Sequence, residues 1–116
     1  MADDNTTVAE LRQMIRQFVD ERDWSQFHSP KNLSMAIAIE AAELMEHFQW
    51  LGAEASREVR NTEEDMQQVR EELADILCFA LSFANALDID VSSAVRDKIV
   101  KNAKKYPADR FRGKFR

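Results

Sequence analysis

Residues 62–87 read TEEDMQQVREELADILCFALSFANAL, and this segment indicates the fold class of the chain. From Met66 to Leu87 the apolar residues recur at the spacing of one helix face. Thr62 followed by three acids is typical of a helix start, because the hydroxyl can cap free N–H groups and the acids complement the helix dipole. The whole chain holds only two Gly and two Pro, which favours a few long helices over many strands and turns.

Working outward, the sequence predicts three more helices with recognisable ends. Thr7 and Glu10 form a capping-box pair, Ser29 precedes a proline in the first helical position, and Pro107 stops the last helix. We read residues 53–61 as a loop with a helical turn, and residues 1–6 and 108–116 as flexible ends. The prediction is an all-α four-helix bundle, one domain over residues 1–116, with the other helices at about Val8 to Arg22, Pro30 to Leu51 and Val91 to Lys105.

Composition is that of a soluble globular protein, with 45% hydrophobic and 32% charged residues in a chain of 116. The net charge is −5, yet the basic residues gather after position 95, so an acidic body ends in a basic segment. Cys78 is the single cysteine and lies in an apolar helical run, which predicts a buried, inert thiol. Without a signal peptide or an uncharged membrane-length stretch, we expect a cytoplasmic protein that binds no membrane.

Four carboxylates lie at the edges of apolar helix faces, where charge is unexpected. Glu40 and Glu43 are three residues apart on one predicted helix, and Glu72 and Asp75 are three apart on the next. Helices joined by a modest loop pack antiparallel, so both pairs should face one groove. Two unit charges about 6 Å apart repel by roughly 3 kcal/mol at an effective dielectric near 20. The four acids therefore need protons, or a hard divalent cation such as Mg²⁺ or Mn²⁺.

Other interpretations of these four acids stay open from the pattern alone. They could form ordinary boundary salt bridges with Lys or Arg of a neighbouring element. A ferritin-like di-iron site needs a Glu-x-x-His step, whereas His47 follows Glu43 by four residues. On the last predicted helix, Lys98 and Asn102 share a stripe with apolar residues and are expected to point inward, either toward phosphate or, for the lysine, toward a carboxylate.

Beyond these patterns, the chain resembles the MazG-like all-α nucleoside triphosphate pyrophosphohydrolases, in particular their dCTP pyrophosphatase branch. Glu40-x-x-Glu43 and Glu72-x-x-Asp75, separated by 28 residues, resemble the acidic signature of that family. The resemblance extends over roughly residues 8–107, through the segments ERDWSQFHSPKNL (21–33), EAAELMEHFQW (40–50), EELADIL (71–77) and KIVKNAKKYP (98–107).

The resemblance implies a Mg²⁺-dependent hydrolysis of (deoxy)nucleoside triphosphates, dCTP or modified dCTP among them, to a monophosphate and pyrophosphate. Water would attack the α-phosphorus, and one of the four acids or Glu46 would accept its proton. The family also implies a homodimer or homotetramer whose pockets receive residues from a partner subunit. The residues implied to hold metal and substrate are Glu40, Glu43, Glu72 and Asp75 for catalysis and metal, and Trp24, His28, Trp50, Phe79, Lys98 and Asn102 for the nucleotide.

Two positions depart from the dCTP-preferring relatives. Ile15 stands where those relatives carry a base-contacting histidine, and Phe79 stands where a tyrosine is frequent. Weaker discrimination for cytosine is therefore expected. Two other classes of function remain as alternatives: a non-catalytic helical module whose acidic stripes bind a basic partner, and a nucleic-acid binder acting through the basic end. Net acidity disfavours the second of these, so no stable nucleic-acid partner is expected.

Overall fold

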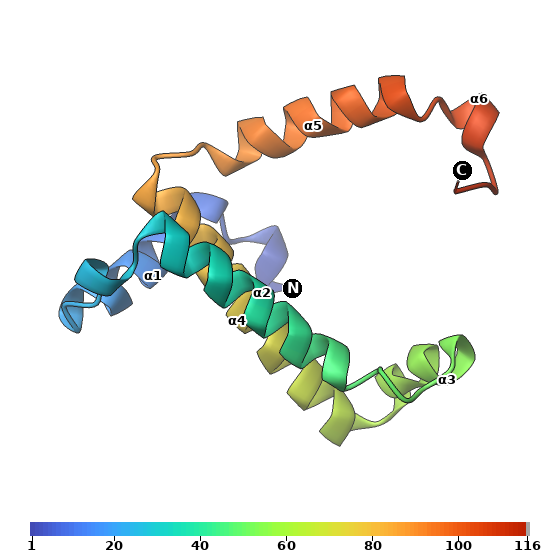
Figure 1. Cartoon of the computed structure of the whole chain (residues 1–116), viewed down its shortest axis with the longest axis horizontal. Coiled ribbons are helices and arrows are strands. Elements are labelled where there is room, and N and C mark those ends of the chain that lie inside the picture. The colour runs from blue at the N-terminus through green and yellow to red at the C-terminus, as the bar shows by residue number, and fades with distance from the viewer. Residues whose placement is uncertain (116) are drawn as a thin grey trace.

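The computed structural model describes residues 1–115, and over these residues it is built of helices without a strand (Figure 1). The predicted all-α class is therefore confirmed. Single 3-10 turns occur at η1 (Ala2–Asp4), η2 (Ser25–Phe27) and η3 (Val59–Asn61). The α-helices are α1 (Val8–Glu21), α2 (Pro30–Glu46), α3 (Ala53–Glu58), α4 (Glu63–Ala86), α5 (Val91–Lys105) and α6 (Ala108–Phe111).

Three of the four long helices begin at a side chain that caps them, whereas Thr62 at the start of α4 forms no side-chain capping bond. The Thr7 hydroxyl accepts a hydrogen bond from the Glu10 amide at 3.1 Å, and the Ser29 hydroxyl accepts one from the Asn32 amide at 3.2 Å. Asp90 accepts a hydrogen bond from the Ser93 amide at 2.9 Å at the start of α5. Each bond satisfies one of the N–H groups that a first helical turn leaves without a partner.

Two aspartates replace glycine where α1 and α4 end. Asp23 and Asp88 adopt left-handed φ angles of 53° and 52°. In each case the next residue donates a hydrogen bond back across five positions, from Trp24 N to Val19 O at 3.0 Å and from Ile89 N to Ala84 O at 2.9 Å. This is the bond pattern of the Schellman motif, in which the left-handed residue lets the chain turn sharply.

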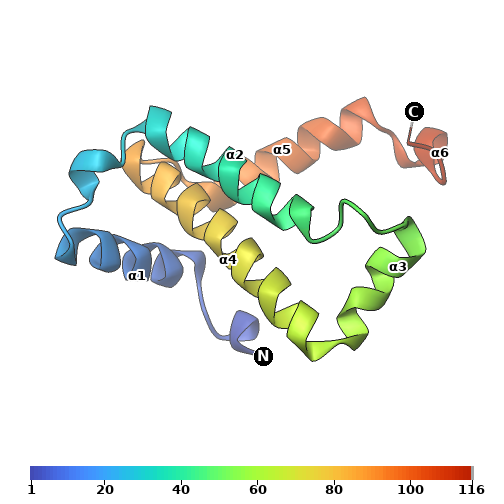
Figure 2. The ribbon, with the colours of Figure 1, turned by 60° about the horizontal axis from the view of Figure 1, so that its bottom comes forward.

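Helices α2 and α4 lie side by side and antiparallel, and α1 packs on α4 (Figures 1 and 2). Leu33 of α2 and Ala84 of α4 are buried, so the core lies where the start of α2 meets the end of α4. The middle of α2 consequently faces the middle of α4, which is where the predicted acidic pairs are.

Helix α5 turns away from this pair instead of packing along it (Figure 1). The chain bends by 103° between α4 and α5, and the radius of gyration is 17.1 Å, against about 13 Å for a compact domain of this length. Apolar residues of α5 such as Ile99 (61% exposed) and Val95 (52% exposed) face solvent. All four predicted long helices are present, but within one chain α5 does not complete a bundle.

Some predicted boundaries differ from the structure. Helix α2 ends at Glu46 and not near Leu51, because the backbone tightens into three-residue steps, from His47 N to Leu44 O at 3.2 Å and from Phe48 N to Met45 O at 3.0 Å. The predicted loop at 53–61 contains α3 and η3, and the ends predicted to be flexible contain η1 and α6. Flexibility of residues 1–6 and 108–116 stays a prediction, and residue 116 lies outside the described residues.

Within residues 1–115, no helix taken alone has both the length and the apolar character to cross a membrane. The bent pair of α4 and α5 passes such a test only when both helices are counted together. Cys78 is exposed, so the prediction of a buried thiol is wrong for the single chain. Partial desolvation, followed by the charge of Asp75, nevertheless raises the pKa of the Cys78 thiol, which disfavours a nucleophilic thiolate.

Candidate metal centre and nucleotide site

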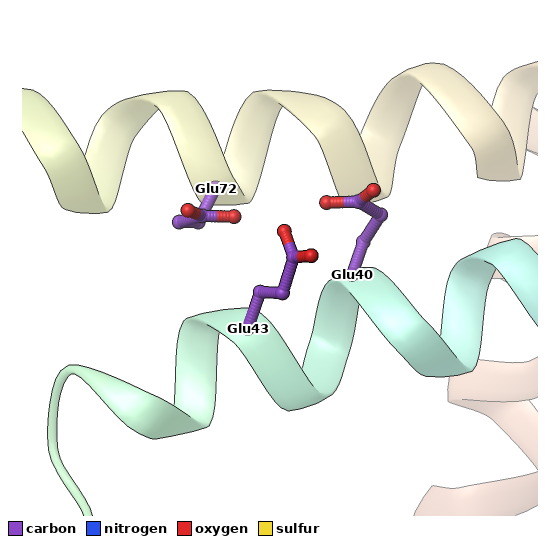
Figure 3. A group of neighbouring side chains, drawn as sticks. All are labelled: Glu40, Glu43 and Glu72. Carbon is purple, nitrogen blue, oxygen red and sulfur yellow. The ribbon is translucent and has the colours of Figure 1, made fainter.

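Three of the predicted acids converge between α2 and α4. Glu40, Glu43 and Glu72, hereafter the glutamate cluster, each place one carboxylate oxygen within 4.8 Å of the others (Figure 3). Glu40 and Glu43 are one turn apart on α2, and Glu72 reaches from α4 into the space between the helices. The i, i+3 spacing on α2 and the antiparallel pairing of α2 with α4 produce this convergence.

Two oxygens of the glutamate cluster are buried without compensation. Oε2 of Glu40 and Oε2 of Glu72 have no hydrogen-bond partner among the described residues. Burial raises the pKa of Glu40, and the neighbouring carboxylates of Glu43, Asp75 and Glu72 raise it further. Leaving a buried acceptor unpaired costs about 1–3 kcal/mol. The donor set is all oxygen, and its unpaired oxygens fit a hard divalent cation between the two helices.

Asp75 lies beside the glutamate cluster and not inside it. Its side chain is exposed, and its carboxylate is not one of the three that lie within 4.8 Å of one another. Its charge still reaches the cluster, since Asp75 contributes to the raised pKa of Glu40. The fourth acid is therefore available at the solvent side of the same site.

The alternative of ordinary boundary salt bridges finds no support in the single chain. Among residues 1–115, no lysine or arginine forms an ion pair with any of the four acids. The basic side chain that does reach them is His47, whose Nε2 lies 3.6 Å from Oε1 of Glu72. The sequence analysis assigns His47 no role at the site, and the available signal is its position four residues, about one helical turn, after Glu43.

An open cleft lies along α4 beyond the acids. Phe79 follows Asp75 by one turn and faces His28, with ring centroids 6.4 Å apart. His28 also lines a cleft of about 410 Å³, together with Ile15, Ser82 and Asn85. A second cleft, of about 310 Å³ between α1 and the start of α5, is lined by none of the predicted site residues. None of the four acids lines the cleft at His28, whose first lining residue on α4, Ser82, follows Asp75 by two helical turns.

The other predicted nucleotide contacts are scattered in the single chain. Trp24 packs edge-on against Phe18 with ring centroids 5.7 Å apart, and Trp50 is 88% exposed in the turn after α2. Lys98 and Asn102 are exposed on α5, which leaves the α2–α4 pair (Figure 1). The expectation that these two residues point inward is wrong for one chain, because helical periodicity identifies a face but not the molecule that covers it.

The chain is similar to known proteins over most of its length. The sequence model of the MazG-like family matches residues 35–114, which include all four acids. The chain is 36% identical over 107 residues to dCTP pyrophosphatase 1 of Bos taurus, covering 92% of this chain and 63% of that protein. It is 34% identical over 102 residues to dCTP pyrophosphatase 1 of Homo sapiens, covering 88% of this chain and 60% of that one. The chain thus spans less than two thirds of these curated relatives.

A solved structure is similar along nearly its whole length. The crystal structure of a pyrophosphatase from Archaeoglobus fulgidus superposes with a TM-score of 0.77 at 40% sequence identity. The similarity covers 85% of this chain and 91% of that chain. The helical fold of this chain is therefore similar to that of this pyrophosphatase.

Proposed function

The chain belongs to the MazG-like family, and on this premise we propose that it hydrolyses nucleoside triphosphates to a monophosphate and pyrophosphate. The observation that carries the proposal is the glutamate cluster, with its buried and unpaired oxygens on Glu40 and Glu72. The names of the relatives support this class of reaction and favour dCTP or a modified dCTP as substrate. Removal of such triphosphates would cleanse the nucleotide pool.

In this proposal Glu40, Glu43, Glu72 and Asp75 hold Mg²⁺, for which Mn²⁺ is a possible substitute. The bound cation would supply charge neutralisation of the triphosphate and a lower pKa for the attacking water. The carboxylates of the chain orient that water, and one of them accepts its proton. Of the four acids, Glu43 and Asp75 are exposed, which makes either carboxylate accessible to a solvent-derived nucleophile.

The base is proposed to lie in the cleft at His28 and Phe79. The rings of His28 and Phe79, inclined by 59° with centroids 6.4 Å apart, supply apolar surface for a base, and Phe79 lies one turn beyond Asp75. Ile15 lines the same cleft and offers no hydrogen bond to a base edge, whereas Ser82 and Asn85 are polar. Discrimination for cytosine is therefore proposed to be weaker than in relatives that have a histidine at this position.

The remaining nucleotide contacts are proposed to come from a second copy of the chain. Lys98, Asn102 and Trp50 are exposed and far from completing a pocket alone, while α5 carries an uncovered apolar face. A homodimer or homotetramer would cover that face and bring the basic residues to the triphosphate. The proposed setting is the cytoplasm, with neither a nucleic acid nor a membrane as partner.

The test is pyrophosphate release from a panel of dNTPs with Mg²⁺ and with EDTA. Glu43→Gln and Asp75→Asn should each abolish turnover while leaving the far-UV circular dichroism unchanged. Turnover at the wild-type rate in either variant would contradict the assignment of the four acids. If the wild-type chain binds a basic protein partner but releases no pyrophosphate from any triphosphate, the non-catalytic alternative holds instead.

A further inference from the structure

His47 lies at the rim of the glutamate cluster and belongs to neither predicted group of site residues. It is the C-cap residue of α2, and its amide donates to the carbonyls of Leu44 and Met45. Across the helix pair, its Nε2 is 3.6 Å from Oε1 of Glu72, and the two side chains are only 28% and 22% exposed. The imidazole is thus anchored on one helix and contacts a carboxylate on the other.

The two oxygens of Glu72 have different surroundings. Oε1 faces the imidazole, whereas Oε2 is buried and accepts no hydrogen bond from the described residues. We propose that His47 is a positioning residue: a proton on its Nε2 holds Oε1 of Glu72, which keeps Oε2 turned into the space shared with Glu40 and Glu43. The proposal rests on the proposed function only in that a divalent cation occupies this space.

Glu72 is the glutamate of the cluster that comes from α4, whereas Glu40 and Glu43 project from α2 (Figure 3). Its three side-chain torsions would have to be ordered at the moment of binding, at an entropic cost. The separation of 3.6 Å is a few tenths of an ångström longer than an N–H···O hydrogen bond, so a small rotation of either side chain closes it.

The expected size of the effect follows from what such partners do elsewhere. Removing a hydrogen-bonding partner of a metal-ligating side chain typically costs about tenfold to a hundredfold in metal affinity. His47→Leu removes the donor and keeps an apolar side chain of similar size. His47→Gln keeps an N–H donor near the position of Nε2. The pair of variants separates the hydrogen bond from the packing of the side chain.

The experiment measures Mn²⁺ affinity by electron paramagnetic resonance of the free ion, with no nucleotide present. His47→Leu should weaken binding about tenfold or more, and His47→Gln should stay close to the wild-type affinity. Gln49→Leu, an exposed polar residue in the following turn, is the matched control and should bind Mn²⁺ as the wild type does. In a Glu72→Gln background, His47→Leu should cause no further loss, because its target carboxylate is gone.

Wild-type affinity in His47→Leu, or an equal loss in His47→Leu and His47→Gln, would overturn the proposal. These outcomes are independent of catalysis. A chain that releases no pyrophosphate but shows the predicted series of Mn²⁺ affinities would contradict the proposed function and still support the role of His47. Normal turnover of the wild type, together with an unchanged Mn²⁺ affinity in His47→Leu, would support the proposed function and contradict the role of His47.

A second measurement covers the case in which a His47 variant does not fold. A long-range ¹H–¹⁵N spectrum of the wild-type protein reports which ring nitrogen of His47 carries the proton. The proton is expected on Nε2, and Glu72→Gln should move that nitrogen resonance. A ring protonated on Nδ1 alone, or a resonance that is unmoved by Glu72→Gln, would contradict the proposal.

Discussion

Arg12 of α1 and Asn85 of α4 hold each other by hydrogen bonds in both directions. Nε of Arg12 donates to Oδ1 of Asn85 at 2.9 Å, and Nδ2 of Asn85 donates to the carbonyl of Arg12 at 3.2 Å. The same guanidinium donates through Nη1 to the carbonyl of Ile89 at 2.6 Å, next to the start of α5. One arginine therefore ties α1 both to the end of α4 and to the connection that leads into α5.

Asn85→Ala should destabilise the fold through this contact. The substitution leaves the half-buried Arg12 without one of its acceptors, and an unpaired group of that kind costs about 1–3 kcal/mol. The check is chemical denaturation of Asn85→Ala beside Gln17→Ala, which removes an exposed hydrogen bond to Glu21. The Gln17 variant should differ from wild type by no more than about 0.5 kcal/mol. Equal stability of both variants would mean that the Arg12–Asn85 pair does not hold α1 in place.

Glu40 should make the metal-free protein less stable as the pH rises. Burial and the neighbouring carboxylates raise its pKa above the ordinary value of 4.5. Above pH 4.5 the folded chain therefore holds its proton longer than the unfolded chain, and folding stability falls until the pH passes the raised pKa. Melting temperatures of wild type and Glu40→Gln in EDTA, compared from pH 4 to 8, isolate this group.

The comparison with Glu40→Gln is needed because the pKa shifts of other acids change the folding stability with pH in the opposite direction. The Arg70 guanidinium lowers the pKa of Glu63, and the Ser93 amide lowers the pKa of Asp90. Their contributions are present at neutral pH and are lost as the pH falls through the lowered values. Glu40→Gln keeps the contributions of Glu63 and Asp90, so the difference in melting temperature between variant and wild type should widen with rising pH. A constant gap would show that Glu40 titrates normally.

Mg²⁺ should stabilise the wild-type chain at neutral pH, because it binds the folded acids and not the unfolded ones. At a free concentration one hundred times the dissociation constant, the gain is about 2.7 kcal/mol. Glu72→Gln should lose most of the shift in melting temperature, and EDTA should reverse it. Glu64→Gln, which removes an exposed acid from the first turn of α4, is the control and should respond as wild type does. A Mg²⁺ shift of wild-type size in Glu72→Gln would argue against a cation between α2 and α4.

Mixing two inactive variants tests whether the site is shared between copies. Glu43→Gln lacks an acid of the glutamate cluster, and Lys98→Ala lacks the proposed phosphate contact on α5. In mixed dimers one of the two sites regains both groups, so an equal mixture should recover up to about one quarter of the wild-type sites. Pyrophosphate release after unfolding and refolding the mixture is the measurement. No recovery would mean that Lys98 serves the acids of its own chain or serves none.

The features that could be predicted from the sequence are those with a local cause. Three helices start with a capping hydrogen bond that spans three residues, from Thr7, Ser29 and Asp90. Such a bond can be predicted from neighbouring residues in the sequence alone. The convergence of Glu40, Glu43 and Glu72 follows from one i, i+3 step on α2 and the antiparallel pairing of α2 with α4. The aspartate turns that replace glycine were less legible, since Asp at a left-handed position is tolerated but not required.

The features that escaped prediction depend on what packs against a helix. Periodicity placed Lys98 and Asn102 on the apolar stripe of α5, but nothing in that stripe says whether the α2–α4 pair of the same chain covers it. The early end of α2 at Glu46 reflects a tightening of the backbone that no glycine or proline announces. His47 contacts Glu72 at that end of α2, and a helix predicted to continue to Leu51 does not indicate this contact.

The departure of α5 has a consequence for how the molecule folds. Val95, Ile99 and Val100 stay more than half exposed in a single chain, so an isolated copy gains little hydrophobic stabilisation from them. If another copy covers them, folding and association become one equilibrium, and the melting temperature rises with protein concentration. Dilution would then remove the fold and the proposed phosphate contacts of α5 together, so that separated subunits would neither persist nor act on nucleotides.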